Sequence, residues 1–241
     1  MRKAIYSTLA LSLCLVMQSF APEATELSYL GSAFDAKTRK IIYTELHEEL
    51  KEKGKHVGTI TTYKDVYGLV IARRKLDFLK DNNTPTFKLE DLRSGYIEGA
   101  EVTNNSVKVY VREDYQSTME ERILHVPQPC VIDGGFNYFV KNNWDALLKG
   151  GILTFNFVVP ARKDYYKFRV RKVSETTYIG KKAIVVHLEP DNFIIRALVD
   201  PIVITYDLSS KRILIYEGIS NLASGTGKNY VAKLLYPTVG P

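Results

Sequence analysis

Three side chains that could do acid–base chemistry alternate along one short stretch of the chain. Tyr43, Glu45 and His47 are two residues apart, so in an extended strand all three would point to the same face. A carboxylate beside an imidazole can act as a general acid–base pair or supply two metal ligands. The same row also fits the solvent-facing side of a strand, and we favour that interpretation. His56 would offer a second histidine across the next turn, but no third metal ligand is indicated.

A single arginine interrupts an otherwise apolar row. In the stretch from Leu69 to Phe78, Arg74 shares its side with Val70, Ala72, Leu76 and Phe78. A charged side chain on a buried row needs a partner, because removing it from water without one is costly. A structural ion pair is the interpretation we favour. The alternative is a site for a ligand carboxylate or phosphate, which a guanidinium group binds well.

No other motif carries recognisable chemistry. Ser220 lies in a Gly-Ile-Ser-Asn-Leu stretch, which lacks the second glycine of a nucleophile elbow. The segment 225–228 resembles a phosphate loop only superficially and fits a hairpin turn, and the charged segment 90–98 fits a tight turn held by local ion pairs. Cys130 fits a buried, inert thiol. The sequence therefore predicts no catalytic site, cofactor or metal; the remaining enzyme hypothesis would use Glu45 and His47.

The first residues have the form of a secretory signal. Arg2 and Lys3 precede an apolar run from Ala4 to Val16 that is too short for a comfortable membrane span. Cleavage after Ala21 or after Ala24 would fit, and Leu13 before Cys14 is unfavourable for a lipidation motif. We expect a signal peptide over 1–24, one β-rich domain over 25–241, a periplasmic location and no transmembrane span in the mature chain. The net charge of +6 is mild and interspersed, which argues against nucleic-acid binding.

Alternation of apolar and polar residues predicts strands along most of the chain. Thirteen stretches qualify: 27–34, 41–50, 56–64, 69–78, 86–92, 107–112, 119–124, 153–159, 165–173, 181–188, 202–206, 212–216 and 229–236. The connections are mostly short, which favours antiparallel neighbours. We expect a mainly β fold, an antiparallel meander of about 11–13 strands that curves into an open barrel or half-barrel.

One long helix is predicted over about 134–149. Asp133 could cap its start, and Gly150 with Gly151 could end it. Asn143 would project near the middle of its apolar stripe, either as a buried amide bonded to the sheet backbone or as a polar contact inside a ligand cavity. A short second helix is expected over 193–198. The apolar stripe contains Phe136, Phe139, Val140, Trp144, Leu147 and Leu148.

Several strands have a strongly apolar side that could line a concave surface beneath this helix. If a cavity remains there, its lining would combine aromatic residues with two polar groups. A plainly filled core is the alternative. The candidate ligand-binding residues are Arg74, Asn143, Trp144, Phe155, Phe157, Tyr166 and Phe168.

Four stretches carry a family resemblance: residues 31–47 (GSAFDAKTRKIIYTELH), residues 200–221 (DPIVITYDLSSKRILIYEGISN), EDLRSGY and FNYFVKNNWDALL. They resemble an uncharacterised family of secreted proteobacterial proteins. In architecture alone, the expected plan is similar to the periplasmic lipoprotein-localisation carriers and to the sensor domain that regulates envelope stress. That similarity implies a half-barrel holding acyl chains under a helical lid. No residue motif of the carriers is matched, so no site is transferred.

These observations give three functional hypotheses. The first is a non-enzymatic periplasmic protein that binds a lipid or another apolar molecule in a half-barrel cavity. The alternative is an envelope assembly or protein-interaction module with a filled core and no small-molecule ligand. The third is an enzyme that uses Glu45 and His47.

Overall fold

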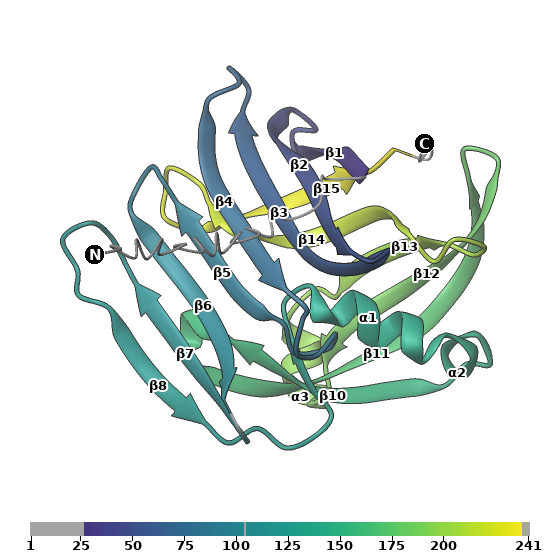
Figure 1. Ribbon diagram of the computed structural model, residues 1–241. Coiled ribbons are helices and arrows are strands. Elements are labelled where there is room, and N and C mark those ends of the chain that lie inside the picture. Colours follow the sequence, from purple (N-terminus) through teal and green to yellow (C-terminus); the bar gives the residue numbers. More distant parts are fainter. Residues whose placement is uncertain (1–26, 104, 238–241) are drawn as a thin grey trace, which may run out of the picture.

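A computed structural model describes residues 27–103 and 105–237, and the expected signal segment lies outside these ranges. The fold is mainly β, as predicted, and its strands form one large, mostly antiparallel sheet that is not closed into a barrel (Figure 1). The strands are β1 (Leu27–Asp35), β2 (Ile41–Glu52), β3 (Lys55–Asp65), β4 (Val70–Asp77), β5 (Thr86–Asp91), β6 (Tyr96–Thr103), β7 (Ser106–Arg112), β8 (Glu120–Leu124), β9 (Cys130–Ile132), β10 (Ile152–Val159), β11 (Asp164–Tyr178), β12 (Lys181–Pro190), β13 (Ile202–Asp207), β14 (Ile213–Ala223) and β15 (Asn229–Leu235).

The strand order is almost the order of the chain. Reading across the sheet it is β8-β7-β6-β5-β4-β3-β2-β1-β15-β14-β13-β12-β11-β10-β9. Among the described residues, only β1 and β15 pair without being neighbours in sequence, and only β9 pairs in parallel, with β10. The two edge strands, β8 and β9, are joined by residues 125–129. The curved sheet therefore nearly returns to its starting point.

Side chains bridge the open seam beside β8. The Arg122 guanidinium on β8 donates to the backbone carbonyl of Lys163 at 3.2 Å, and the Lys163 ammonium pairs with Glu120. Lys163 follows the short 3-10 helix η1 (Pro160–Arg162), which lies against β6 and β7. Charged side chains of this kind also protect an edge strand from pairing with other chains.

Two of the fifteen strands were not predicted from the sequence. One is β6, which contains Glu98, Gly99 and Glu101 and therefore looks like a polar loop. A side chain at Gly99 would collide with the Tyr110 ring, since a Cβ there would lie 2.2 Å from its Cζ atom. The other is β9, which has only three residues and is shorter than a periodicity can detect.

The predicted long helix is wrong in one respect: it is two short helices, α1 (Gly135–Asn142) and α2 (Trp144–Leu148). The break lies at Asn143, whose side-chain amide donates to the carbonyl of Phe139 at 2.8 Å. A side chain that bonds its own backbone competes with regular helix geometry. The Asn143 amide is therefore bonded within its own helix, and the interpretation that it bonds the sheet backbone was wrong. Asp133 does not cap α1 either; Gly134 is the N-cap, without a side-chain bond.

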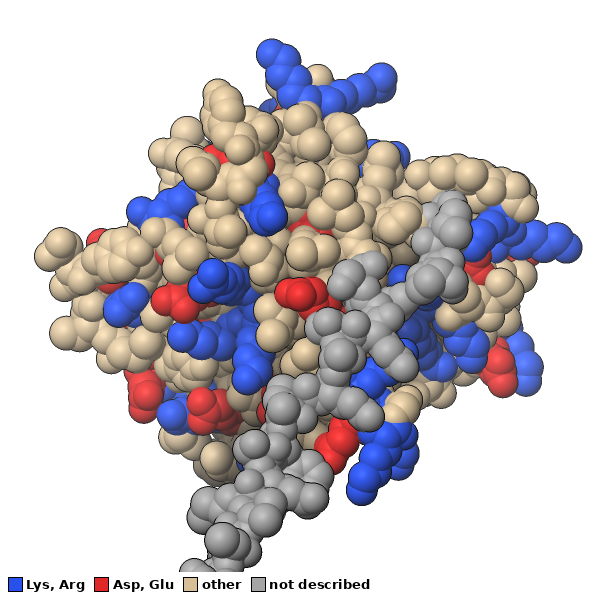
Figure 2. All heavy atoms as spheres, turned by 45° about the horizontal axis from the view of Figure 1, so that its top comes forward, with Lys and Arg blue, Asp and Glu red and all other residues tan. Residues whose placement is uncertain are grey.

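Two large clusters of buried side chains and a small one around Ala183, Leu214 and Ile215 form the core of the described residues. The first lies on the inner face of β2 to β7 and includes Tyr43, Tyr63, Phe87 and Leu89. The second packs α1 and α2 against β10 to β13. Acidic and basic side chains are intermixed over the face that Figure 2 shows. None of the helices in the described ranges has the length and apolarity needed to cross a bilayer.

Candidate functional site

The Tyr43–Glu45–His47 row lies inside the molecule, so the solvent-facing interpretation was wrong. The three side chains are 1%, 5% and 4% exposed. They lie on the face of β2 that contributes to the first core cluster, and the rings of Tyr29, Tyr63 and Tyr236 contact them. Polar groups tolerate such burial only when they are hydrogen-bonded.

Each member of the row has a partner. His47 Nε2 lies 2.8 Å from Glu45 Oε2, and Thr61 Oγ1 lies 3.1 Å from His47 Nδ1. The Tyr236 hydroxyl donates to Glu45 at 3.0 Å. Burial pushes the pKa of Glu45 upward, but the hydrogen bond and charge of His47, together with Arg74, outweigh it, so this pKa is lowered.

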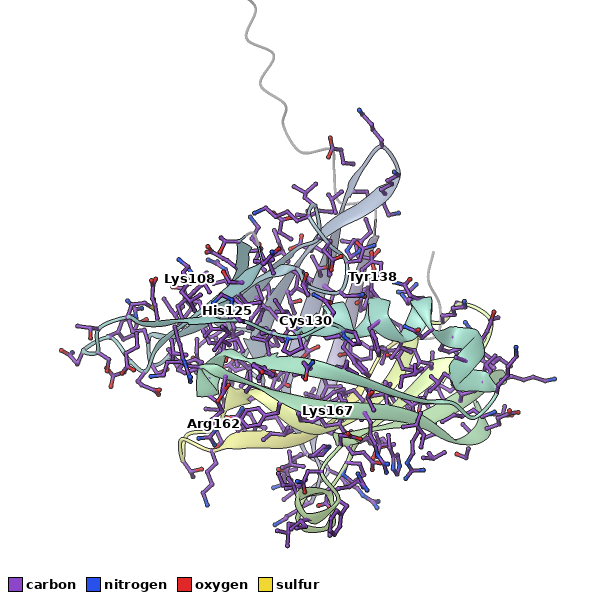
Figure 3. The ribbon with its side chains drawn as sticks, turned by 90° about the horizontal axis from the view of Figure 1, so that it is seen from below. Lys108, His125, Cys130, Tyr138, Arg162 and Lys167 are labelled. Carbon is purple, nitrogen blue, oxygen red and sulfur yellow. The ribbon has the colours of Figure 1, made fainter. Side chains whose placement is uncertain are left out.

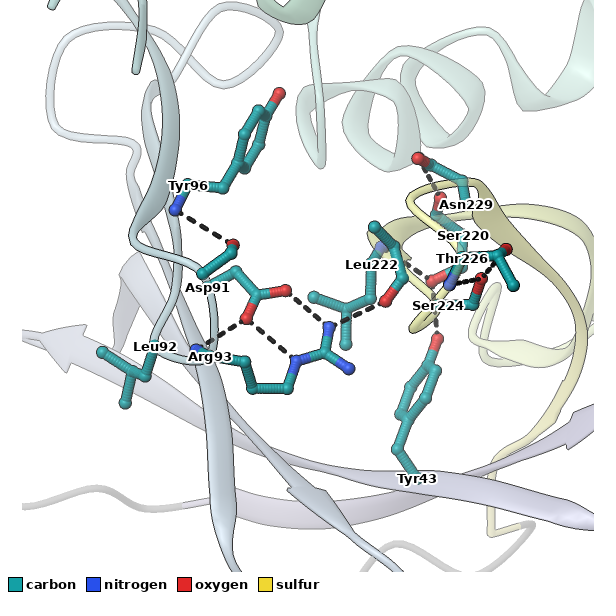
Figure 4. Close-up of polar contacts among 12 residues, drawn as sticks. Tyr43, Asp91, Leu92, Arg93, Tyr96, Ser220, Leu222, Ser224, Thr226 and Asn229 are labelled. Atoms are coloured by element: carbon teal, nitrogen blue, oxygen red, sulfur yellow. Dashed lines mark hydrogen bonds and ion pairs between the residues drawn. The ribbon is translucent and has the colours of Figure 1, made fainter. Parts of the chain in front are cut away.

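The row also contacts an aromatic ring on β1 and a hydroxyl group on β14, which is far away in sequence. The Tyr29 ring stacks on His47 with 4.6 Å between ring centroids. The Tyr43 hydroxyl bonds the Ser220 hydroxyl at 2.7 Å, as Figure 4 shows. Both ring nitrogens of His47 have protein partners, which are Glu45 and Thr61. The arrangement links β2 to β14 through Ser220 and to the segment after β15 through Tyr236.

Arg74 has the acidic partner that the ion-pair interpretation requires. Its guanidinium donates to Asp133 Oδ1 at 3.1 Å and to Thr61 Oγ1 at 3.4 Å. Asp133 Oδ2 accepts from the Asn221 amide at 3.0 Å. The two charged side chains are 18% and 11% exposed. This ion pair joins β4 to the start of α1 and to β14.

A second polar link, near one end of the sheet, holds the charged segment 90–98. The Arg93 backbone and its Nε both donate to Asp91 Oδ1 at 2.9 Å (Figure 4). Arg93 Nη2 also donates to the Ala223 carbonyl at 2.8 Å, across to the β14–β15 hairpin. The hydrogen bond with Asp91 raises the pKa of Arg93. This segment is a tight turn held by a local ion pair, as predicted.

The seven candidate ligand-binding residues do not surround one cavity. Trp144 and Phe155 are 4% and 1% exposed, and the Phe155 ring lies 4.8 Å from that of Phe139. Phe157 and Phe168 join the same aromatic cluster at a centroid distance of 5.7 Å. The rings of Phe155, Phe157 and Phe168 form a chain of contacts, and the Trp144 ring contacts Tyr206. The other three residues are not part of this packed cluster. Tyr166 is opposite Phe157 on the neighbouring strand but is exposed, Arg74 belongs to the polar network, and Asn143 bonds its own helix.

A hollow of about 580 Å³ lies elsewhere, between the β2–β3 turn, the β4–β5 connection and α1. Its floor is apolar and aromatic, and two lysines stand at its edge. The Tyr138 hydroxyl lies 2.6 Å from His56 Nδ1, and the Thr59 hydroxyl lies 2.9 Å from His56 Nε2. Burial lowers the pKa of His56, which favours the neutral ring. The lining residues are Glu52, Lys53, Lys55, His56, Val57, Phe78, Leu79, Asn82 and Tyr138.

Sequence reasoning missed this hollow because three separated connections form it. His56 was considered only as a metal partner for His47, and its contacts with Tyr138 and Thr59 do not support that. Figure 3 shows Tyr138 on α1. No group of three or more potential metal ligands occurs among the residues that the structure describes.

A smaller hollow of about 230 Å³ borders Cys130. The thiol is buried, and burial raises its pKa to about 12. Such a thiol stays protonated and unreactive near neutral pH. This agrees with the inert core cysteine expected from the sequence.

We compared the chain with known proteins. No protein-family model, curated protein or solved structure matches it significantly.

Glu98 is a buried carboxyl group with an unusual proton affinity. It is 8% exposed, and its Oε2 accepts from the backbone amide of Ala161 at 3.1 Å. Burial, and then the charge of Asp133, raise its pKa to about 7. Because the folded pKa is above the unfolded one, the folded protein binds more protons between these two values. Stability is therefore expected to fall as the pH rises through this window.

We expect Glu98→Gln to remove this pH dependence. The amide keeps an oxygen for Ala161 but carries no charge, so the variant should be more stable than the wild type by up to about 3 kcal/mol at about pH 8 and similar to it at about pH 4. Urea unfolding at both pH values measures this. Glu101→Gln, on the same strand with a 42% exposed side chain, is the control and should show no such difference. Equal pH slopes for Glu98→Gln and the wild type would contradict the prediction.

Proposed function

We propose that this chain is a non-enzymatic periplasmic protein that binds an amphiphile in the hollow beside the β2–β3 turn. The observation that carries the proposal is an apolar floor with cations at its edge. Val57, Phe78, Leu79 and Tyr138 offer the floor. An acyl chain or another apolar group would lie on it, with an acidic head group directed toward the lysines.

The size and charge of the hollow support this class of ligand. Small-molecule sites commonly enclose about 300–1,000 Å³ and combine apolar walls with a few polar groups. Lys53 and Lys55 supply positive charge, while Glu52 is the acidic residue of the lining. The Lys141 ammonium stands 5.9 Å from the centre of the Tyr138 ring, which is within the range of a cation–π contact.

The proposal keeps the ligand class inferred from the sequence and moves the site. The interior aromatic residues are packed against one another, whereas the outer hollow is open to solvent. Secretion to the periplasm remains part of the proposal and is supported by the form of residues 1–24. The half-barrel plan that we expected from the sequence resembles that of the periplasmic carriers, which favours an apolar ligand but identifies no residue.

Two substitutions test the site directly. Leu79 is 64% exposed, so Leu79→Asp should not affect folding but should weaken binding of a fluorescent fatty acid by at least about tenfold. Leu69→Asp, at a site that is 66% exposed on the β3–β4 turn, is the matched control. Both variants are measured by fluorescence titration, with circular dichroism to verify folding.

The charged edge of the hollow is tested separately. The double variant Lys53→Glu/Lys55→Glu should weaken the binding of a fatty acid by about tenfold. It should weaken the binding of the corresponding fatty alcohol much less, because only the acid carries a charge. Lys37→Glu with Lys40→Glu is the control pair on another turn. If none of the hollow variants changes affinity, or if the wild type binds no amphiphile, the proposed site is wrong.

The alternative from the sequence is an envelope assembly or protein-interaction module. The packed aromatic cluster under α1 and α2 favours it over a carrier with an internal cavity. Native mass spectrometry separates the two: protein purified from a bacterial envelope should retain a lipid-sized ligand under our proposal and a partner protein under the alternative.

A further inference from the structure

The short helix α3 (Phe193–Leu198) presents an apolar surface with no cover from the described part of the chain. It connects β12 to β13 and buries none of its residues. The exposed fractions of its apolar side chains and of the residue after it run from 46% to 80%. Such a concentration of exposed apolar residues is unusual on the surface of a soluble monomeric protein. The residues are Phe193, Ile194, Ile195, Leu198 and Val199.

This segment is held firmly in place. The Asn192 side chain accepts from the backbone amides of Ile194 and Ile195 at 2.9 and 3.2 Å, which caps the helix. The Arg196 guanidinium donates to the carbonyls of Pro190 and Asp191 at 3.1 and 2.9 Å. The apolar side chains are therefore presented by an ordered turn.

The helix lies on the outer side of the sheet. Its connection to β12 is tied to β11 by a hydrogen bond from the Asp191 amide to the Lys167 carbonyl at 2.9 Å. Figures 1 and 3 place α3 on the opposite side of β10 and β11 from α1, beyond Lys167. It is therefore remote from the hollow beside Tyr138.

Positive charge exceeds negative charge beside this surface. Lys167, Arg169 and Arg171 alternate along β11, so they share its outer face. Arg169 and Arg171 both pair with the one carboxylate of Glu189, at 2.7 and 3.1 Å. Lys167 pairs with Asp191 at 3.3 Å, and its side chain is still 61% exposed.

Three further titratable residues are needed to compare positive and negative charge beside α3. Arg196 is cationic and bonds neutral carbonyls, and Asp200 follows the helix as one more acid. His187 faces Arg171 across the strand pair; burial and then the charge of Arg171 lower its pKa, so it adds no charge near neutral pH. Four cations thus stand against three acids.

We propose that α3 is a contact site for the surface of an anionic lipid bilayer. The apolar side chains would enter the interfacial region, and the β11 cations would meet lipid phosphates. Short apolar prominences flanked by cations bind membrane surfaces in this way. A protein partner fits less well, since a stable protein interface needs roughly 1,200–2,000 Å² of buried surface and α3 is six residues long.

Vesicle co-sedimentation of the full chain tests the inference. We expect binding to vesicles of phosphatidylcholine with phosphatidylglycerol, and weaker binding to phosphatidylcholine alone or at high salt. The double variant Phe193→Ser/Leu198→Ser should lower the bound fraction by at least about tenfold. Both positions are exposed, at 71% and 80%, so the variant should fold normally.

The control is Tyr67→Ser/Leu69→Ser, at positions that are 87% and 66% exposed on the β3–β4 turn. It should bind vesicles as the wild type does. The inference is overturned if the wild type does not bind anionic vesicles, or if both double variants lose binding equally. It is also overturned if the α3 variant changes only self-association in analytical ultracentrifugation. The reversal of Lys53 and Lys55 should leave vesicle binding unchanged, which separates this inference from the amphiphile site.

Discussion

Replacing Arg74 with methionine is expected to lower the free energy of unfolding by about 3–5 kcal/mol at neutral pH. The substitution removes the cation that lies 3.1 Å from Asp133. Asp133 would then remain as a largely buried carboxylate without its positive partner, and Glu45, which keeps His47, would lose a more distant cation. Methionine fills much of the volume, so the loss reports on charge rather than on packing. Urea unfolding measures it.

A matched control lies one residue away. Arg73 is on the exposed face of β4, and Arg73→Met should cost less than about 1 kcal/mol. Adding Asp133→Asn to Arg74→Met should recover part of the lost stability, because it removes the uncompensated charge. A cost for Arg74→Met as small as that of Arg73→Met would show that the ion pair contributes little to folding.

Truncating Phe155 to alanine is expected to lower the free energy of unfolding by about 3–5 kcal/mol. The ring is 1% exposed and contacts the rings of Phe136 and Phe139 at centroid distances of 5.7 and 4.8 Å. Its removal leaves a cavity that α1 and β10 cannot easily fill. Thermal or urea unfolding of the purified protein measures the loss.

The loss of stability on truncating Phe155 also distinguishes a filled interior from a lipid cavity. Tyr166 projects on the same side of the neighbouring strand and is 44% exposed, so Tyr166→Ala should cost less than about 1 kcal/mol. A residue that lines a lipid cavity would be replaceable with little loss of stability in the ligand-free protein. An equally small cost for Phe155→Ala would therefore argue against the packed interior.

The sequence predicts the architecture well because period-two alternation and short turns are local features. The strands of the β2–β3 and β11–β12 hairpins are examples. The same periodicity says that Tyr43, Glu45 and His47 share a face but not which face is buried. Ile42 and Leu46 lie on the other face and are the more apolar set, so the sequence alone favours the wrong assignment.

The polar network explains why that assignment fails. Glu45 is satisfied by Tyr236, Tyr43 by Ser220, and Arg74 by Asp133. Each partner is distant in sequence, so no local pattern can reveal it. The hollow was missed for a similar reason, since a turn, a loop and a helix meet there only in the folded chain. The aromatic cluster, in contrast, follows from the apolar sides of the strands at Phe155 and Phe168.

The single non-sequential strand pair, β1 with β15, has a kinetic consequence. Every other pair of strands closes a short connection or the helical crossover before β10, whereas this one closes a loop of about 200 residues. By loop-closure entropy that costs about 3 kcal/mol more than closing a ten-residue hairpin. Two ribbons, β1 to β8 and β9 to β15, can thus assemble independently, and their union in the middle of the sheet should come late. Until then, Glu45 lacks Tyr236 and Arg74 lacks Asp133, so the hydrogen bonds of these buried polar groups are completed only as the two ribbons dock.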